Sequence, residues 1–569
     1  MKSVTVQNIL KCQIAWITLS AILLSFAGII RILFAFILAA IIEASLNLDL
    51  EAFYRVIIVA CFMLFFSCLL SLLGNNLRRK YAAYAAVNHK NELLEKILST
   101  SSEDYAAKSE AFYLNILNDE VDIIKNDYYI QVPQIIFDVV LIVGSIIALL
   151  YINWILFFVI LLLLSITAII PNIVAKYYSK KLLIFTKMNE ILISYTKSLL
   201  SGFELIKTFS LNRHILRDYN NQNDSRERSS YKLGIVNNVQ IEVANLVGFS
   251  LHMGTIIAGI FFVFRGDLEI AMLFAAVQVV QTLVYPLQEL MRRIGVIKGS
   301  RELIAKHNEI LAEKDKTFNY AKLKAEKIST ICLKNISFKY PNSTFGLNAV
   351  SYTFEANKKY AIIGKSGSGK STLLKLMMGY YSDYSGRLQI NDQEIRDIDH
   401  ASLYEKMSLL HQNVVLLEDT LSNNIKLFRD IDDGDLNETI RAVKLQTLYK
   451  RFEFKSLRAD SMSLISGGEK QRIAVARSIV HNNSFVLLDE ATSAIDPETT
   501  QEIYDIMLNL PNTTLIAVTH DWTDELLERF DAVLYLDDGE IRNVGKWALI
   551  KETINPQFSR LHNISKEQV

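Results

Sequence analysis

The stretch from Gly364 to Thr372 contains the residues with the most specific chemistry in the chain. It joins a short apolar run, Tyr360–Ile363, to a helix-like run, Leu373–Met378. Glycines allow backbone angles at which successive N–H groups point at phosphate oxygens, and the start of a helix adds partial positive charge. The sequence therefore predicts a loop that binds the phosphates of ATP, formed by Gly364, Lys365, Ser366, Gly367, Ser368, Gly369, Lys370, Ser371 and Thr372. In such a loop Lys370 reaches the β- and γ-phosphates, and Ser371 is a ligand for Mg²⁺.

Two predicted strands further along the chain end in polar residues. Phe485–Leu488 is followed by Asp489 and Glu490, and Leu515–Val518 leads through a threonine to His520. In a nucleotide-hydrolysing site Asp489 would hold Mg²⁺, and Glu490 would act as general base toward the attacking water. An imidazole at the end of the second strand can hydrogen-bond the γ-phosphate.

The rest of the chain must position these groups, and its composition points to a membrane protein. Of 569 residues, 51% are hydrophobic, and 60 Lys and Arg balance 60 Asp and Glu, which gives no electrostatic argument for a nucleic-acid partner. The four cysteines have no metal-ligand spacing, and three of them lie in or beside apolar segments as small core residues. They are Cys12, Cys61, Cys68 and Cys332.

Six long apolar segments lie before about residue 300. Because a helix needs about 20 apolar residues to span a bilayer, we expect six transmembrane helices, the first of them retained rather than cleaved as a signal peptide. The segments are Gln13–Ala44, Ala52–Leu73, Pro133–Tyr151, Trp154–Ile173, Ala244–Phe264 and Ile270–Leu287.

Basic residues gather at alternate ends of these segments, whereas the connections at the opposite ends are short and not basic. The positive-inside rule then places both termini and the phosphate loop in the cytosol. The basic residues are Lys11, Arg78, Arg79, Lys80, Lys176, Lys180, Lys181, Arg292 and Arg293. We expect a multi-pass protein of a bacterial cell membrane.

The two internal cytosolic connections predict long helical extensions. A continuous helix from Ala52 to about Leu98 would be ~70 Å long, so roughly 40 Å of it must lie outside the hydrocarbon core. The connection from Asn172 to Tyr231 has the same character. We expect the turns at the tips near Ser109–Leu117 and Leu200–Leu211.

Polar residues on the last two membrane helices fall on single faces. Because unpaired polar groups are costly in lipid, these faces should point toward a cavity or another helix. The first face holds Asn238, Glu242, Asn245 and His252, and the second holds Gln278, Gln281, Tyr285 and Gln288. Arg31 and Asp138 also lie inside apolar helices, where an ion pair and a cavity lining are both open.

After Arg301 the chain becomes less apolar. Glu302–Tyr320 is predicted as a linker, and strands and helices alternate from about Ile328. We therefore expect a helical membrane domain with linker over 1–320 and an α/β nucleotide-binding domain over 321–569.

A further motif, Ile465–Arg472, opens a helix between the phosphate loop and Asp489. With it the sequence resembles the ATP-binding cassette transporters, and six membrane helices ahead of one cassette resemble the exporter-type half-transporters. The matches to the family's motifs are Ser466, Gly467 and Gly468 for the signature, Gln412 for the Q-loop, Tyr340 for the aromatic residue that stacks on adenine, Asp496 for the D-loop and His520 for the switch histidine.

The resemblance implies how the parts work together. Two cassettes face head to tail, each ATP is held by one phosphate loop and the partner's signature, and one chain therefore needs a second subunit. Gln412 would join Ser371 and Asp489 as a Mg²⁺ ligand and would sense the γ-phosphate. Asn118–Asp119 and Gly202–Lys207 resemble the family's coupling segments, which would pass ATP-driven closure to the membrane helices.

Three details depart from the family pattern. Ile465 and Glu469 replace the usual Leu and Gln of the signature, and Ala459–Met462 stands where the family often has a Gly-Glu-x-Gly stretch. Lys370 and Glu490 are present, so the catalytic equipment of this subunit looks intact.

We therefore predict an ATP-driven half-transporter that works as a dimer by alternating access and exports an amphipathic peptide, lipid or drug. Because the first apolar segment begins at Gln13, we expect no fused peptidase. Two alternatives stay open: an importer of siderophore-like substrates built on the same fold, and an ATP-gated regulatory subunit of a heterodimer. A soluble cassette ATPase acting on nucleic acid is excluded by the six spans.

Overall fold

The structure is a computed structural model that describes residues 14–106, 108–167, 169–312, 327–340, 345–452, 456–489, 497–519 and 521–554. The chain divides into two compact units. The first takes in the chain up to Glu95 together with Glu110–Glu313, and the second takes in Lys96–Ser109 together with Lys314–Val569. Each unit is described by itself.

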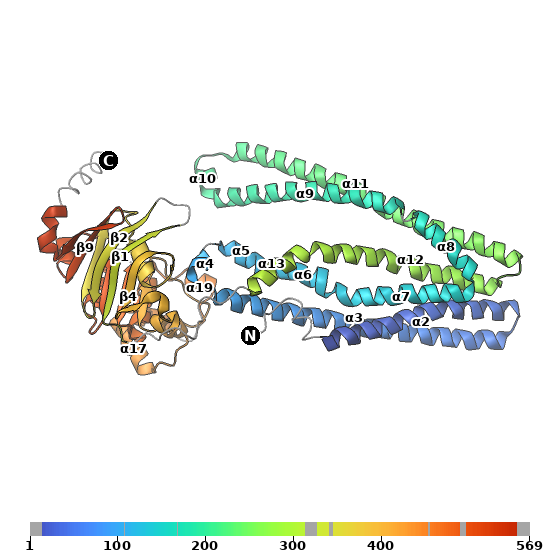
Figure 1. Cartoon of the computed structure of the whole chain (residues 1–569), viewed down its shortest axis with the longest axis horizontal. Helices are drawn as coiled ribbons and strands as arrows, with labels where there is room; N and C mark the ends of the chain where they lie inside the picture. The colour runs from blue at the N-terminus through green and yellow to red at the C-terminus, as the bar shows by residue number, and fades with distance from the viewer. Residues whose placement is uncertain are drawn as a thin grey trace. The chain divides into compact units, whose positions relative to one another are not determined.

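The first unit is built of helices (Figure 1). Small residues let α2 approach α7 closely: Ala27, Ala35 and Ala39 are buried, and a Cβ added at Gly28 would lie 3.0 Å from Cδ2 of Leu141. The elements are α2 Ile14–Leu46, α3 Leu50–Leu98, α5 Glu110–Asn115, η1 Ile116–Glu120, α6 Val121–Ile124, η2 Lys125–Tyr129, α7 Gln131–Ile152, α8 Trp154–Thr167, α9 Ile169–Ser201, α10 Phe203–Thr208, α11 Asn212–Phe264, α12 Ile270–Gly299 and α13 Arg301–Ala312.

Five helical segments among the described residues are long and apolar enough to cross a membrane. They contain the first, second, third, fifth and sixth predicted spans. The fourth predicted span falls on α8, an apolar helix of 14 residues, and on the start of α9, with residue 168 between them outside the described part of the chain. The predicted helical membrane domain is therefore confirmed.

The first cytosolic extension has the predicted length, but its turn lies earlier than predicted. Helix α3 has 49 residues, or ~74 Å, and ends at Leu98. The hydroxyls of Ser99 and Thr100 donate to the carbonyl of Lys96 at 2.9 and 3.0 Å and so compete with the helical pattern. The expected tip at Ser109–Leu117 was therefore wrong. Asn118–Asp119 lies in the returning helix.

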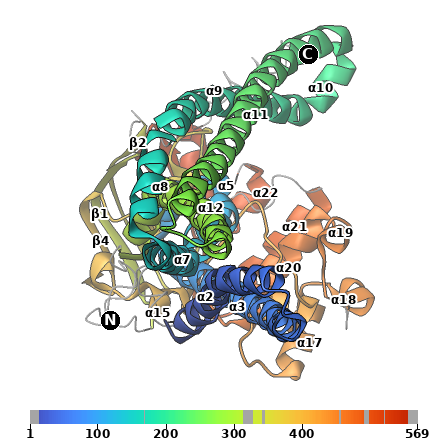
Figure 2. The same ribbon diagram turned by 90° about the vertical axis from the view of Figure 1, so that its right-hand side faces the viewer.

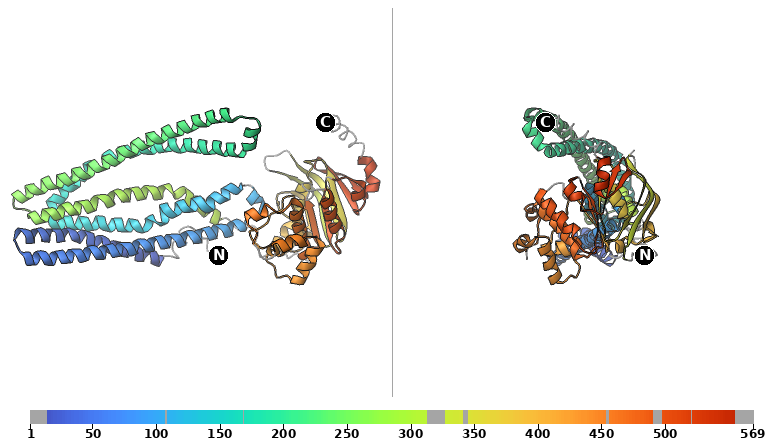
Figure 3. Two further views of the ribbon diagram at one scale, coloured as in Figure 1. Left: turned by 180° about the vertical axis from the view of Figure 1, so that it is seen from behind. Right: turned by 90° about the vertical axis from the view of Figure 1, so that its left-hand side faces the viewer.

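The second extension turns where the sequence predicted. Helix α9 ends at Ser201, α10 forms a short connecting helix, and α11 begins at Asn212. Figures 2 and 3 show the α10 end of this helical pair standing apart from the other helices of the unit. The apolar side chains of Phe203, Leu205 and Phe209 are exposed there.

The stretch expected as a linker begins as a helix. Helix α13 covers Arg301–Ala312, and its apolar residues Leu303, Ile304, Ile310 and Leu311 pack against clusters of buried residues that come mainly from α3, η1, α6 and η2. The linker prediction was wrong for Glu302–Ala312, since these residues contain no Gly or Pro and form an apolar stripe with helical spacing. The remaining predicted linker residues lie outside the described part of the chain.

A polar network connects α13 to α3, η1 and η2. The Tyr129 hydroxyl lies 3.1 Å from Nδ1 of His89, whose Nε2 lies 3.1 Å from Nδ1 of His307. Nε2 of His307 lies 3.0 Å from Glu120, which also accepts from Lys306 at 2.6 Å. All three contacts of the rings can be hydrogen bonds when both imidazoles are neutral and protonated at Nε2. The Tyr129 hydroxyl then donates to His89, His89 donates to His307, and His307 donates to Glu120. We call these five residues the histidine network.

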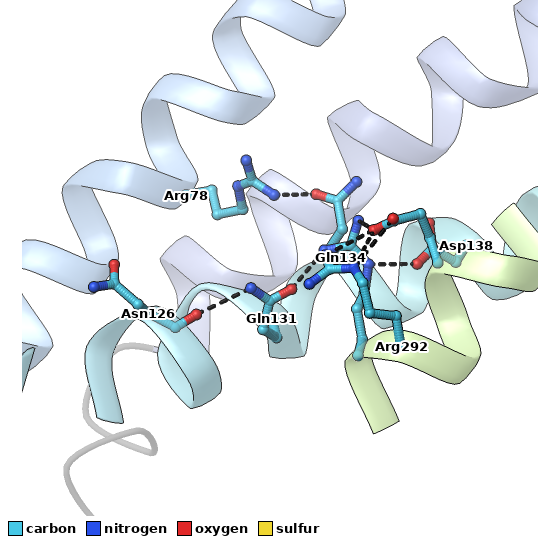
Figure 4. A network of polar contacts seen from close by, with 8 residues as sticks. Arg78, Asn126, Gln131, Gln134, Asp138 and Arg292 are labelled. Atoms are coloured by element: carbon cyan, nitrogen blue, oxygen red, sulfur yellow. Dashed lines mark hydrogen bonds and ion pairs between the residues drawn. The ribbon is translucent and has the colours of Figure 1, made fainter. Parts of the chain in front are cut away.

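A second network crosses from α7 to α12 (Figure 4). Nε of Arg293 donates to Asp138 at 2.7 Å, its Nη2 lies 3.0 Å from Glu289, and its Nη1 donates to Gln131 at 2.5 Å. Asp138 and Arg293 are buried. Asp138 is therefore half of an ion pair, whereas Arg31 donates to Ser71 at 3.3 Å.

The second unit holds an α/β domain with two sheets. The four-stranded sheet is antiparallel in the order β2-β1-β4-β5, and the six-stranded sheet has the order β10-β9-β3-β8-β7-β6, with β3, β6, β7, β8 and β9 parallel. The strands are β1 Thr330–Lys339, β2 Gly346–Glu355, β3 Lys359–Gly364, β4 Ser385–Ile390, β5 Gln393–Glu394, β6 Met407–Leu410, β7 Phe485–Asp489, β8 Thr514–Val518, β9 Ala532–Asp537 and β10 Glu540–Gly545.

The six-stranded sheet is buried on both faces, so the predicted α/β nucleotide-binding fold is confirmed. Along β7, Val486 and Leu488 point into one core while Phe485 and Leu487 point into the other. The helices of this unit are α4 Ser102–Ala106, α14 Lys370–Met377, η3 Ile395–Asp397, α15 His400–Tyr404, α16 Leu421–Lys426, α17 Asp433–Ala442, α18 Gln446–Phe452, α19 Ala459–Met462, α20 Gly467–Val480, α21 Pro497–Leu508 and α22 Asp524–Leu527. The C-terminal ends of the parallel strands form the edge where ligands of such sheets bind.

Candidate nucleotide-binding site

The phosphate loop lies between β3 and α14, as predicted. Gly367 and Gly369 have φ of +79° and +103°, angles that non-glycine residues rarely adopt. A Cβ at Gly369 would also lie 2.6 Å from Cδ2 of Leu347. The positive φ therefore favours glycine at this position, and an added Cβ would also require the Leu347 side chain to move.

Two buried polar groups in the loop fit a phosphate ligand. Lys370 is 4% exposed, and its ammonium donates to the carbonyls of Gly364 and Lys365 at 3.0 and 2.9 Å. The hydroxyl of Ser368 is buried and has no hydrogen-bond partner among the described residues. Because a buried unpaired hydroxyl costs free energy, it favours a ligand with acceptor oxygens at this point.

The fold brings Ser371 to Asp489 across the sheet. The Ser371 hydroxyl donates to Oδ1 of Asp489 at 2.6 Å, although the two residues lie far apart in sequence. A hydroxyl and a carboxylate at the same point suit Mg²⁺, which binds through few protein ligands together with phosphate oxygens and water. Clusters of three or more His, Cys, Asp or Glu residues with metal-binding geometry do not occur in the described part of the chain.

Tyr340 lies beside the start of α14. Its hydroxyl is 3.0 Å from that of Thr372, and its ring makes edge contacts with Phe338 and Tyr381 at centroid distances of 5.1 and 5.6 Å. Burial raises the pKa of Tyr381, so this phenol stays neutral. The arrangement fixes the Tyr340 ring close to the phosphate loop, where an adenine-stacking residue is expected.

Gln412 follows β6, which pairs in parallel with β7. It therefore leaves the sheet at the same edge as Asp489. At the preceding residue, partial burial lowers the pKa of the His411 imidazole, while the nearby carboxylate of Asp489 opposes the shift. His411 is therefore neutral near pH 7 and adds no positive charge beside this edge.

Ser466 caps the helix that carries the signature. Its hydroxyl accepts from the N–H of Glu469 at 3.2 Å, and the Glu469 carboxylate accepts from the N–H of Ser466 at 2.8 Å. Behind the cap, a Cβ at Gly468 would lie 2.9 Å from Cγ2 of Thr499 on α21. Glu469 in place of the usual Gln thus completes a capping box, which explains why this departure is compatible with the helix start.

The structure brings together the phosphate loop, Asp489 and Tyr340, and it places Gln412 at the same sheet edge. Glu490, Asp496 and His520 lie outside the described residues, so their roles stay predictions. Sequence reasoning assigned no role to Gln471, whose side chain contacts the Q-loop. The only feature of the sequence that pointed to Gln471 was its place inside the Ile465–Arg472 motif.

Comparison with known proteins identifies both halves of the chain. Residues 17–287 match the family model of the ABC transporter transmembrane region, and residues 347–493 match that of the ABC transporter. The chain is 30% identical over 396 residues to the mitochondrial iron–sulfur clusters transporter ATM1 of Saccharomyces cerevisiae, covering 65% of this chain and 56% of the relative. It therefore spans little more than half of that relative's own length.

Two further matches cover almost the whole chain. The ATP-dependent lipid A-core flippase of Pseudomonas aeruginosa is 23% identical over 537 residues, with 91% of this chain and 86% of the relative covered. A solved bacterial Atm1-family ABC exporter with ATP bound shares the fold with a TM-score of 0.79 and 20% identity, covering 94% of this chain and 97% of that one. The chain therefore belongs to the ATP-binding cassette transporter family, as a multi-pass integral membrane protein with the family's ATPase domain in the same chain.

Proposed function

We propose that this protein is an ATP-driven exporter that works as a dimer and moves an amphipathic substrate out of the cytosol. The observation that carries the proposal is the set of parts found in this chain. They are a phosphate loop with its Ser371–Asp489 pair, a capped signature helix and a membrane domain. Names of relatives support export, since a lipid A-core flippase and a β-(1→2)glucan export protein are among them.

ATP binding uses the loop amides, Lys370 and the Tyr340 ring. Lys370 exchanges its two carbonyl acceptors for phosphate oxygens, and Ser368 gains the partner that it lacks within the described chain. Mg²⁺, when bound at Ser371 and Asp489 with Gln412, neutralises charge on the phosphates. Glu490 then takes a proton from the attacking water, and His520 orients the γ-phosphate.

Dimer closure follows from the signature helix. Ser466 and the N–H groups at the start of α20 carry partial positive charge suited to a γ-phosphate bound to a second copy. One phosphate loop and one signature per chain make two complete sites only in a dimer. Hydrolysis removes the bridging phosphate and lets the cassettes separate.

The membrane domain offers a surface for substrate. Asn238, Glu242 and Asn245 lie on one open surface of α11 together with apolar residues such as Val239 and Phe249. The mixture of polar and apolar groups suits an amphipathic molecule. His252, on the same predicted face, lies 3.3 Å from Gln281 of α12.

The direct test is ATPase activity of the full chain reconstituted alone in lipid vesicles. We expect activity that depends on Mg²⁺, a loss of at least about 100-fold in Glu490→Gln, and a loss of at least about tenfold in Ser466→Ala, which removes a contact to the ATP of the second subunit. The exposed Ser225→Ala on α11 is the control and should leave activity unchanged. Equal activity of isolated monomers, unaffected by Ser466→Ala, would refute the shared-site mechanism.

Direction is tested separately. Inside-out vesicles should accumulate a fluorescent amphipathic probe upon ATP addition, and right-side-out vesicles with ATP inside should lose it. The opposite result would favour the importer. If the chain alone shows no activity and a second half-transporter restores it, the result would favour the heterodimer.

A further inference from the structure

The segment that carries Gln412 has no regular secondary structure of its own. From His411 to Asp419 the backbone runs between the end of β6 and the start of α16 without helix or strand. Its geometry must therefore come from side chains that bind its backbone groups. Two of the side chains that do so belong to the signature helix α20.

Gln471 holds the start of this segment. Its side chain is 5% exposed, and its Nε2 donates to the carbonyl of Gln412 at 2.7 Å and lies 3.5 Å from that of His411. Six residues further along the helix, Nη2 of Arg477 donates to the carbonyl of Val415 at 3.0 Å. Both donors belong to α20.

Asn424 holds the far end. Its side chain is fully buried, accepts from the N–H of Leu417 at 2.8 Å and donates to the carbonyl of the same residue at 2.9 Å. Arg477 also binds the backbone carbonyl of Asn424 at 2.7 Å, so this third anchor is itself tied to α20. The whole segment is thus fastened to the signature helix.

The same helix begins at Ser466, only ~7.5 Å of helical rise before Gln471. A hydrogen-bonded helix with a capping box moves as a unit. Displacement of the helix start therefore shifts the donor that holds the Gln412 carbonyl. A contact with α21 also restrains this part of α20, because Arg472 donates to Glu502 at 2.6 Å.

We propose that Gln471 is a positioning residue that couples the signature Ser466 to the Q-loop Gln412 within one cassette. The proposal rests on the function proposed above, in which Ser466 contacts the ATP of the second subunit and Gln412 serves the ATP of its own. Gln471 then links the two ATP sites of the dimer, so engagement of one site sets the position of Gln412 in the other.

The test uses Gln471→Met in the full-length chain in lipid vesicles. Methionine has a similar length and keeps the burial, but it lacks the amide donor. The matched control is Gln501→Met, the same change at an exposed position on α21. We expect Gln471→Met to lower kcat about tenfold and weaken the apparent affinity for Mg²⁺ about three- to tenfold, while KM for ATP changes less than about twofold.

The decisive measurement is a double-mutant cycle with Gln412→Ala. If Gln471 acts through Gln412, the double variant is no slower than Gln412→Ala alone. If the kcat losses of Gln471→Met and Gln412→Ala multiply in the double variant, the two residues act independently and the proposed coupling is refuted. A loss of ATP binding that matches the loss of kcat would also overturn it, because that result indicates general damage to the fold.

A second readout does not need turnover. Hydrogen–deuterium exchange of peptides covering His411–Leu417 should speed up at least about threefold in Gln471→Met and stay unchanged in Gln501→Met. Unchanged exchange in both variants would overturn the proposal. If the proposed function is wrong, the wild-type chain will show no ATPase activity. In that case the exchange experiment alone tests whether Gln471 positions the Q-loop.

Discussion

The histidine network gives a prediction whose size can be worked from the structure. His89 is fully buried in the cytosolic extension of α3, well past the apolar run that ends at Leu73. Burial, reinforced by the neighbouring His307, lowers the pKa of His89 from about 6.5 to about 3. Burial also lowers the pKa of His307, although Glu120 opposes that shift. Both rings are therefore neutral in the folded protein near pH 7.

The sign of the pH effect follows from proton binding. Between pH 7.5 and 5.5 the unfolded chain takes up most of a proton at His89, while the folded chain takes up almost none. Stability is therefore lost as pH falls through the ordinary histidine pKa, by about 1.4 kcal/mol for this one group over those two pH units. For a domain of this size the apparent Tm should fall by about 2–4 °C through His89 alone.

The assay is thermal unfolding of the detergent-solubilised chain at pH 7.5 and 5.5, for wild type and His89→Gln. Glutamine keeps a donor toward His307 but does not titrate, so the wild-type Tm should drop by about 2–4 °C more than that of the variant. His214→Gln, at an exposed histidine, is the control and should behave as wild type. Equal pH dependence of His89→Gln and wild type would refute the argument that burial excludes the proton.

Three further predictions concern other parts of the chain. Asp138→Asn removes one of the two carboxylates that contact the buried Arg293, and Glu289 remains as the other. We expect the membrane domain to lose about 1–3 kcal/mol of stability, with part of the loss recovered in the D138N/R293Q double variant; both are read from apparent Tm in detergent. Gly369→Ala forces a left-handed residue and a steric clash, so the Kd for a fluorescent ATP analogue should rise at least about tenfold, and an unchanged Kd would contradict the loop geometry. Tyr340→Phe removes only the contact with Thr372 and should change that Kd less than about threefold, whereas Tyr340→Ala should raise it about tenfold; equal effects of the two would argue against stacking.

Local patterns in the sequence were sufficient to predict the nucleotide half. The order of glycines around Lys370, and the carboxylates after an apolar strand, depend on residues close together in the chain. The contact between Ser371 and Asp489 then follows from parallel strands whose C-terminal ends meet at one edge. The tie from Gln471 to the Q-loop was not predictable, because it depends on how α20 packs against β6.

The membrane half was predicted by length rather than by motif. Apolar segments long enough to cross a bilayer predicted the positions of the membrane helices. The lack of Gly and Pro predicted the long helical extension that ends at Leu98. The turn after it was placed too late because side-chain hydroxyls at Ser99 and Thr100 end a helix that propensity alone would continue. The partner of Asp138 depends on tertiary packing, so charge patterning alone could not name Arg293.

Glu469, which departs from the family pattern, has two opposing effects on the start of α20. It stabilises the helix start, and it reduces the attraction of that helix start for a phosphate. Its carboxylate accepts from the N–H of Ser466 and lies in the first turn, where negative charge favours the helix. The same charge offsets part of the positive potential with which the helix start would attract a γ-phosphate. Under the dimer mechanism proposed above, we therefore expect closure on ATP to depend more on Lys370 and on the Ser466 hydroxyl than in a signature that carries glutamine at this position.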